Sequence, residues 1–181
     1  MNVPFSKHVQ TKLCTVQTFT SLGVGVSRKN QSLPMLFDLC AQCQRCCHVD
    51  EDYPPLEVTL TLQETKRHGR VCIETRCEHL GPVGCKLGET KPVSCKLYPL
   101  SFEPQTRTFH FDVECPLKPA YFEQLANPAS EAWLHLSKMA QTIQELEHSD
   151  AAFLATNYAI DLDYFELEVL PVTPWVDRKL T

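Results

Sequence analysis

The stretch Cys40-Ala-Gln-Cys43-Gln-Arg-Cys46-Cys47 places four cysteines within eight residues. Two-residue gaps between cysteines let successive thiolates meet at one centre while the backbone turns around it, and zinc sites and iron–sulfur clusters both use such gaps. Single buried cysteines pack as small apolar side chains, but packing does not account for four of them in so short a segment. We therefore interpret this segment as the start of a metal-binding module. Because adjacent side chains tend to diverge, we expect Cys46 and Cys47 to serve different centres, or one of them to serve none.

Further cysteines downstream complete the set of predicted metal ligands, which is Cys40, Cys43, Cys46, Cys47, Cys77, Cys85, Cys95 and Cys115. Eight thiolates are enough for two four-sulfur sites, or for one such site with the other thiols in redox or structural roles. Cys14 and Cys72 complete the ten cysteines of the chain, and we expect neither to be an essential ligand. His48 and His79 lie near cysteines, but lone histidines of this kind are more often non-ligands. Spacing does not separate zinc from iron, since both accept four thiolates.

Charged side chains accompany the predicted ligands. Basic residues stand close to cysteines at Arg45, Arg76, Lys86 and Lys96. Positive charge lowers the pKa of a thiol and offsets the negative charge of a tetrathiolate site, although ordinary solvated surface charge explains these residues equally well. Glu114 directly precedes Cys115 and either supports that ligand or faces solvent.

The composition of the 181-residue chain is that of a globular protein, with 43% hydrophobic and 22% charged residues. A formal net charge of −5 argues against nucleic-acid binding, and no apolar run is long enough to span a bilayer. The cysteines would suit disulfides in a secreted protein, but we find no export signal, and in a reducing compartment they favour metal or redox chemistry. We therefore expect a cytoplasmic protein that binds a metal ion or cluster and neither a membrane nor nucleic acid. The sequence identifies no protein partner.

Three regions follow from the change of composition along the chain. Residues 1–37 contain no acidic side chain and are rich in Ser and Thr, so we interpret them as a basic, flexible tail. The alternatives are an organelle transit peptide, with which this composition is loosely similar, and translation that starts at Met35. Residues 38–117 form the predicted cysteine-cluster domain, and residues 118–181 the predicted helical C-terminal extension.

Within the cysteine-cluster domain, the sequence predicts a short strand over Leu56–Leu60. Thr61 and Glu64 then fit a capping box, which predicts a helix that ends near Gly69. Residues 71–96 are rich in Gly and Pro and are expected to be mostly loop. The alternation of apolar and polar side chains predicts a hairpin of Leu97–Phe102 with Arg107–Val113.

The C-terminal extension has helical periodicity. We expect one short helix over Pro119–Leu125 and a longer one that starts at Asn127-Pro128. Apolar residues recur along the longer helix at helical spacing and are assigned to the core: Trp133, Leu136, Met139, Ala140, Ile143 and Leu146. Ser149 or Asp150 caps a further helix to about Tyr158, and the last residues are expected to be an extended tail. The predicted fold class is therefore α+β: a small irregular metal-stapled cysteine module with a short β-hairpin, followed by C-terminal α-helices.

Over residues 38–117 the chain resembles the CxxCxxCC cysteine-cluster family (YkgJ-like), whose members are regarded as zinc- or iron-chelating domains. The matching motifs are Cys40-x-x-Cys43-x-x-Cys46-Cys47, Leu60-Thr61-x-x-Glu64, Cys77-Glu-His-Leu80, Gly84-Cys85-Lys-Leu87, Lys91-Pro92-Val-Ser-Cys95-Lys96-Leu-Tyr98-Pro99 and Cys115-Pro116. The chain departs from the family at Gln44, where a glycine is common, and in having lysine instead of arginine at Lys91 and Lys96. Lysine keeps the positive charge but loses the bidentate donor geometry of arginine.

The resemblance implies metal binding through all eight cysteines, with an iron–sulfur cluster (of the 4Fe-4S type) or zinc as the cofactor. A flagellin lysine N-methylase is similar to this group in its cysteine cluster, so an iron–sulfur enzyme that methylates proteins or carries out redox chemistry is the alternative function. The chain shows no glycine-rich loop suited to S-adenosylmethionine, because Gly23-Val-Gly25 lacks a strand–turn–helix context. A third hypothesis is that the protein stores metal or carries out thiol-redox chemistry. Whether the protein is an enzyme stays open at this point.

Overall fold

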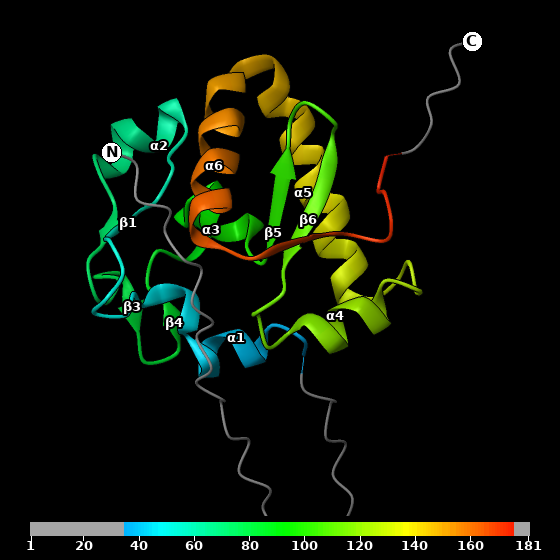
Figure 1. The fold of residues 1–181 in the computed structure, drawn as a ribbon, viewed down its shortest axis with the longest axis horizontal. Helices are drawn as coiled ribbons and strands as arrows, with labels where there is room; N and C mark the ends of the chain where they lie inside the picture. The colour runs from blue at the N-terminus through cyan, green and yellow to red at the C-terminus, as the bar shows by residue number, and fades with distance from the viewer. Residues whose placement is uncertain (1–34, 176–181) are drawn as a thin grey trace, which may run out of the picture. The chain divides into compact units, whose positions relative to one another are not determined.

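The computed structural model describes residues 35–175, apart from the side chains of Leu39 and Ala41. It contains α-helices and small antiparallel sheets, which confirms the predicted α+β class (Figure 1). Most of residues 1–37, including Cys14 and the Gly23-Val-Gly25 segment, lie outside the described residues. No helix within residues 35–175 is both long and apolar enough to cross a bilayer.

A three-stranded antiparallel sheet forms the centre of the fold. Strand β5 (Leu100–Glu103) pairs with β6 (Thr108–Asp112), and β6 pairs on its other edge with β7 (Leu167–Val169). The predicted hairpin is confirmed, but its first strand starts later, because Leu97 belongs to the short helix α3 (Val93–Leu97). No strand was predicted for the segment that supplies β7, which pairs with β6 through backbone hydrogen bonds.

Three helices follow the hairpin: α4 (Lys118–Gln124), α5 (Glu131–Ser149) and α6 (Ala151–Tyr164). The expected start of α5 at Asn127 was wrong. Ser130 is the cap, because its Oγ accepts a hydrogen bond from the N–H of Trp133 (3.2 Å), whereas the Asn127 Oδ1 accepts from the N–H of Ala129 (3.0 Å) in a local turn. Asp150 caps α6 as expected, with Oδ1 accepting from the Phe153 N–H.

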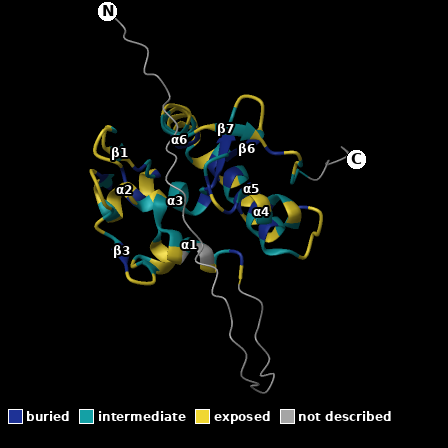
Figure 2. Ribbon diagram, turned by 60° about the horizontal axis from the view of Figure 1, so that its bottom comes forward, coloured by how far each residue is buried: buried dark blue, intermediate teal, exposed yellow. Residues whose placement is uncertain are grey.

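The main hydrophobic core lies between the sheet and these helices (Figure 2). The apolar stripe of α5 is buried as predicted, apart from the half-buried Trp133. It packs with aromatic side chains of the hairpin and of α4: the Phe111 and Tyr121 rings lie 5.0 Å apart between centroids, and both are fully buried. Leu36 and Leu170 are also buried in this core, which therefore draws on both ends of the described chain.

The cysteine-bearing region consists of short elements: α1 (Asp38–Cys43), the 3-10 turn η1 (Arg45–Cys47), β1 (Leu56–Glu57), α2 (Leu62–His68), β2 (Cys72–Ile73), β3 (Leu80–Gly81), β4 (Gly84–Cys85), η2 (Gly88–Thr90) and α3. The capping box is confirmed, since Thr61 Oγ1 accepts from the Glu64 N–H (3.2 Å) and Glu64 Oε2 accepts from the Thr61 N–H (3.0 Å). A small second cluster of buried residues supports this region: Val49, Val58, Val71 and Ile73.

Helix α6 joins the cysteine-bearing region to the sheet. At its start, Asp150 Oδ2 accepts a hydrogen bond from the N–H of Leu62 (2.8 Å). At its end, the hydroxyl of Tyr164 donates to the carbonyl of Pro54. Between these points, Asp161 Oδ2 accepts from Ser101 Oγ on β5 (2.6 Å). This helix therefore fixes the distance between the two hydrophobic clusters.

Leu136→Ala is expected to lower the free energy of unfolding by about 2–5 kcal/mol, because Leu136 is fully buried in the main core. The matched control is Leu134→Ala, two residues away on α5 and 58% exposed, which should change that free energy by less than about 0.5 kcal/mol. Urea unfolding of both variants measures the difference. Equal effects would contradict the assignment of the buried face.

Asp161 should make stability depend on pH. Burial raises the pKa of Asp161 to about 7, while the unfolded carboxyl titrates near about 3.9. The folded state therefore holds the proton over that interval, so the free energy of unfolding falls as the pH rises from about 4 to about 7. Asp161→Asn is expected to remove this fall in urea unfolding across that range, and the exposed Asp163→Asn on the same helix is expected to keep it. A slope unchanged by Asp161→Asn would contradict the prediction.

Candidate metal centre

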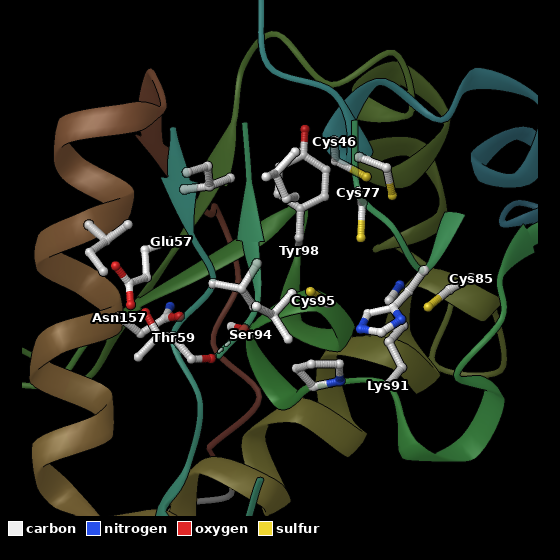
Figure 3. Close-up of a pocket in the computed structure, with 18 of the residues that line it drawn as sticks. Cys46, Glu57, Thr59, Cys77, Cys85, Lys91, Ser94, Cys95, Tyr98 and Asn157 are labelled. Carbon is white, nitrogen blue, oxygen red and sulfur yellow. Dashed lines mark hydrogen bonds between the residues drawn. The ribbon is translucent and has the colours of Figure 1, made fainter. Parts of the chain in front are cut away.

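One cavity of about 80 Å³, whose wall includes residues of α6, is lined by five of the predicted ligands: Cys46, Cys47, Cys77, Cys85 and Cys95. Figure 3 shows cysteines on one side of this cavity and Glu57, Thr59 and Asn157 on the other. The remaining wall includes aliphatic side chains, among them Val58 and Ile160. Thiols that are far apart in the sequence thus share one space.

The CxxCxxCC stretch folds as a helix, a tight turn and a second helical turn. Cys40 and Cys43 are three residues apart on α1, which places them on the same face of that helix. Gln44 then ends α1 in the left-handed conformation (φ 54°), with its N–H donating to the carbonyl of Cys40 (3.0 Å). This reversal carries the chain directly into η1 with Cys46 and Cys47.

An ion pair ties this stretch to the last cysteine. The guanidinium of Arg45 donates to Glu114 Oε2 (3.0 Å) and to the Glu114 carbonyl (3.2 Å). Arg45 precedes Cys46 and Glu114 precedes Cys115, so the pair holds the two segments that carry these cysteines against each other. Glu114 is therefore ion-paired and does not simply face solvent.

The central cysteines are held by backbone hydrogen bonds. The N–H of Cys77 donates to the carbonyl of Cys47 (2.8 Å), which joins the first stretch to the middle loop. Strands β3 and β4 pair Leu80 with Cys85, and the N–H of Lys86 donates to the His79 carbonyl (2.8 Å). These contacts place Cys85 on the same side of the cavity as Cys77.

Burial keeps several thiols protonated. It raises the pKa of Cys95 and of Cys115 to about 12, and it also raises the pKa of Cys40 and of Cys77. Metal ligation needs thiolates, so a metal that binds here must displace these protons. Metal affinity would therefore increase with pH.

Cys46 and Cys47 do not diverge in this structure. The thiol of Cys46 donates a hydrogen bond to Cys47, which raises the pKa of Cys46 and lowers the pKa of Cys47. The ammonium of Lys91 lies close enough to lower the pKa of both thiols in part. The Cys47 thiol, whose pKa is lowered to about 6, therefore ionises more readily than the thiols whose pKa is raised: Cys40, Cys46, Cys77, Cys95 and Cys115.

Lys91 lines the cavity, a position that was not predicted from the sequence, although the residue was identified as a motif position with lysine in place of arginine. The basic residues singled out were Arg45, Arg76, Lys86 and Lys96, yet Lys91 lines the cavity and its charge also acts on Cys40 and Cys95 (Figure 3). Its position just before α3, which carries Cys95, was the available signal. Lys96 faces elsewhere, since its Nζ donates to the Glu89 carbonyl (2.7 Å).

The two histidines near cysteines and Cys72 were considered as further metal ligands, and they lie in different places. His79 lines the cavity beside the cysteines, whereas His48 is exposed and its Nδ1 lies 3.0 Å from the Gln44 carbonyl oxygen. Cys72 pairs with Glu57 across β1 and β2 and is not part of the cavity wall. No disulfide joins any two of the nine described cysteines.

The thiols are gathered but not in ligand geometry: within residues 35–175, no three His, Cys, Asp or Glu side chains are grouped as a bound ion would require. The donor set itself suits zinc or an iron–sulfur cluster, because thiolates are the soft ligands that both prefer. Metal binding is coupled to folding in many small metal-binding domains. Side-chain rotation would be required to complete any site here.

Comparison with known proteins gives no relative: no family model, no curated protein and no solved structure matches the chain.

Gln44→Gly is expected to raise the free energy of unfolding by up to about 1 kcal/mol, because the left-handed conformation is costly for residues with a Cβ and free for glycine. Gln42→Gly, at an exposed position inside α1, is the matched control and should lower it by about 0.5–1 kcal/mol. Urea unfolding distinguishes the two. If both substitutions destabilise equally, the turn does not have this conformation.

Proposed function

We propose that the protein binds a metal through its cluster of eight cysteines, either as zinc or as an iron–sulfur cluster. The observation that carries the proposal is the convergence of cysteines from η1, the loop before β3, β4 and α3 on one cavity. The similarity of the cysteine pattern to the YkgJ-like family supports the same function.

Packing gives an independent argument for a metal. The region from α1 to α3 has a separate hydrophobic cluster of only four buried residues, and most of its helices and strands are two to seven residues long. A structural zinc site contributes about 10–16 kcal/mol of binding free energy in small zinc-finger peptides. A bound metal would thus supply stability that apolar burial in this region does not.

The chain's own residues have defined parts in this proposal. Arg45 and Glu114 hold two ligand segments together, and Lys91 offsets the negative charge of the thiolates. Zinc would act by cross-linking the loops, while an iron–sulfur cluster would add the ability to accept an electron.

The first experiment is anaerobic purification followed by an absorption spectrum and elemental analysis of one sample. Iron with acid-labile sulfide and a broad band near about 400 nm would establish a cluster, and a colourless protein with stoichiometric zinc would establish a zinc site. A protein that is purified without metal and that takes up neither metal on reconstitution would refute the proposal.

Metal removal is expected to disorder residues 40–96 while the β5–β6 hairpin and α5 keep at least part of their structure, because both are buried in the main core. Limited proteolysis after treatment with a chelator should give new cleavage sites between Cys40 and Lys96, and circular dichroism should retain helical signal. The control is the same digestion after metal is restored. A digestion pattern unaffected by the chelator would argue against a structural role for the metal.

A further inference from the structure

The eight cysteines divide into two sets according to the part of the fold that holds them. The core-side set is Cys40, Cys43, Cys46 and Cys115, and the loop-side set is Cys47, Cys77, Cys85 and Cys95. Each set has four members, which is the number of thiolates that a tetrahedral zinc site or a four-iron cluster uses.

Two members of each set pack against a different hydrophobic cluster. Cys115 is buried in the main core and Cys40 packs against it. Cys77 and Cys95 instead pack against the small cluster formed by the valines and Ile73. These four thiols are therefore held by two different parts of the fold.

Local bonds join members within each set. The Arg45–Glu114 ion pair (3.0 Å) lies directly beside Cys46 and Cys115, which belong to the core-side set. The hydrogen bond from the Cys77 N–H to the Cys47 carbonyl (2.8 Å) joins two members of the loop-side set. All four loop-side thiols line the same cavity.

Strand pairing also joins members of the loop-side set. The antiparallel register of β3 and β4 sets Cys85 opposite Leu80, which lies three residues after Cys77. The hydrogen bond from the Leu80 N–H to the Cys77 carbonyl (3.0 Å) closes the turn between them.

Helix geometry joins members of the core-side set. Cys40 and Cys43 are three residues apart on α1 and therefore lie on the same face of that helix. The turn at Gln44, whose N–H donates to the Cys40 carbonyl (3.0 Å), then leads directly to Cys46. The two sets meet at the adjacent pair Cys46 and Cys47.

We propose that the protein has two separate four-thiolate metal centres, one formed by the core-side set and one by the loop-side set, joined through the peptide bond between Cys46 and Cys47. This inference rests on the proposed function and specifies its ligands and stoichiometry. Cys46 also lines the cavity, so its side chain must rotate towards Cys115 when metal binds.

The test uses the full chain, stripped of metal under reducing conditions and titrated with zinc ions. Native mass spectrometry is expected to find two zinc ions per chain at saturation, as eight thiolates allow. At partial loading, alkylation followed by peptide mapping should find that the cysteines of one set are protected together. A single zinc ion at saturation, or one-zinc protein that protects members of both sets, would overturn the inference while leaving metal binding intact. Failure to bind zinc or to take up an iron–sulfur cluster would refute the proposed function itself.

Variants give an independent measurement. Cys40→Ser with Cys115→Ser, or Cys85→Ser with Cys95→Ser, should each halve the zinc content measured by elemental analysis, and the four changes together should abolish it. Cys72→Ser, outside both sets, is the matched control and should retain all the zinc. Loss of all zinc from one pair alone, in a variant whose helical circular dichroism is unchanged, would overturn the division into two centres. If a variant unfolds, the alkylation pattern of the wild-type chain decides.

Discussion

Burial of the β5–β6 hairpin against α4, α5 and α6 is the constraint on which the position of every described cysteine depends. Phe111 and Tyr121 are fully buried at this contact, and each such side chain contributes about 1.5–3 kcal/mol. Segments that carry predicted ligands are connected to both ends of this hairpin. Helix α3 with Cys95 precedes β5, and Cys115 follows β6. Helix α6 then holds the cysteine-bearing loops at a fixed distance from the sheet. A well-packed core therefore positions loops that have little apolar material of their own.

Local signals predicted much of this fold. The capping box of Thr61 and Glu64 and the apolar stripe of α5 depend on residues close in sequence, and both were predicted correctly. Strand β7 was not predicted, because its pairing with β6 joins segments that are far apart, and a three-residue strand has no recognisable period. The start of α5 was misplaced because Asn127 and Ser130 are both good caps, and the choice between them depends on which N–H each side chain reaches.

The candidate site was predictable in its residue types and not in its arrangement. The spacing of the cysteines predicted that thiols converge, and the structure brings five of the eight to one cavity. Spacing does not report which neighbours those thiols have. The place of Lys91 in the cavity wall and the contact of Glu114 with Arg45 became visible only in the structure. Both depend on how the loops pack, which the sequence pattern does not encode.

The Arg45–Glu114 pair has a consequence for the order in which the chain assembles. Its partners are 69 residues apart, and the segment between them includes all of β5 and β6. Closing so long a loop costs entropy that only a formed hairpin can offset. Cys47, Cys77, Cys85 and Cys95 precede β5, so they leave the ribosome before the hairpin is complete, at a synthesis rate of about 5–20 residues per second. We therefore expect the nascent chain to gather its cysteines in two stages, the loops first and Cys115 last, once the hairpin has folded behind it.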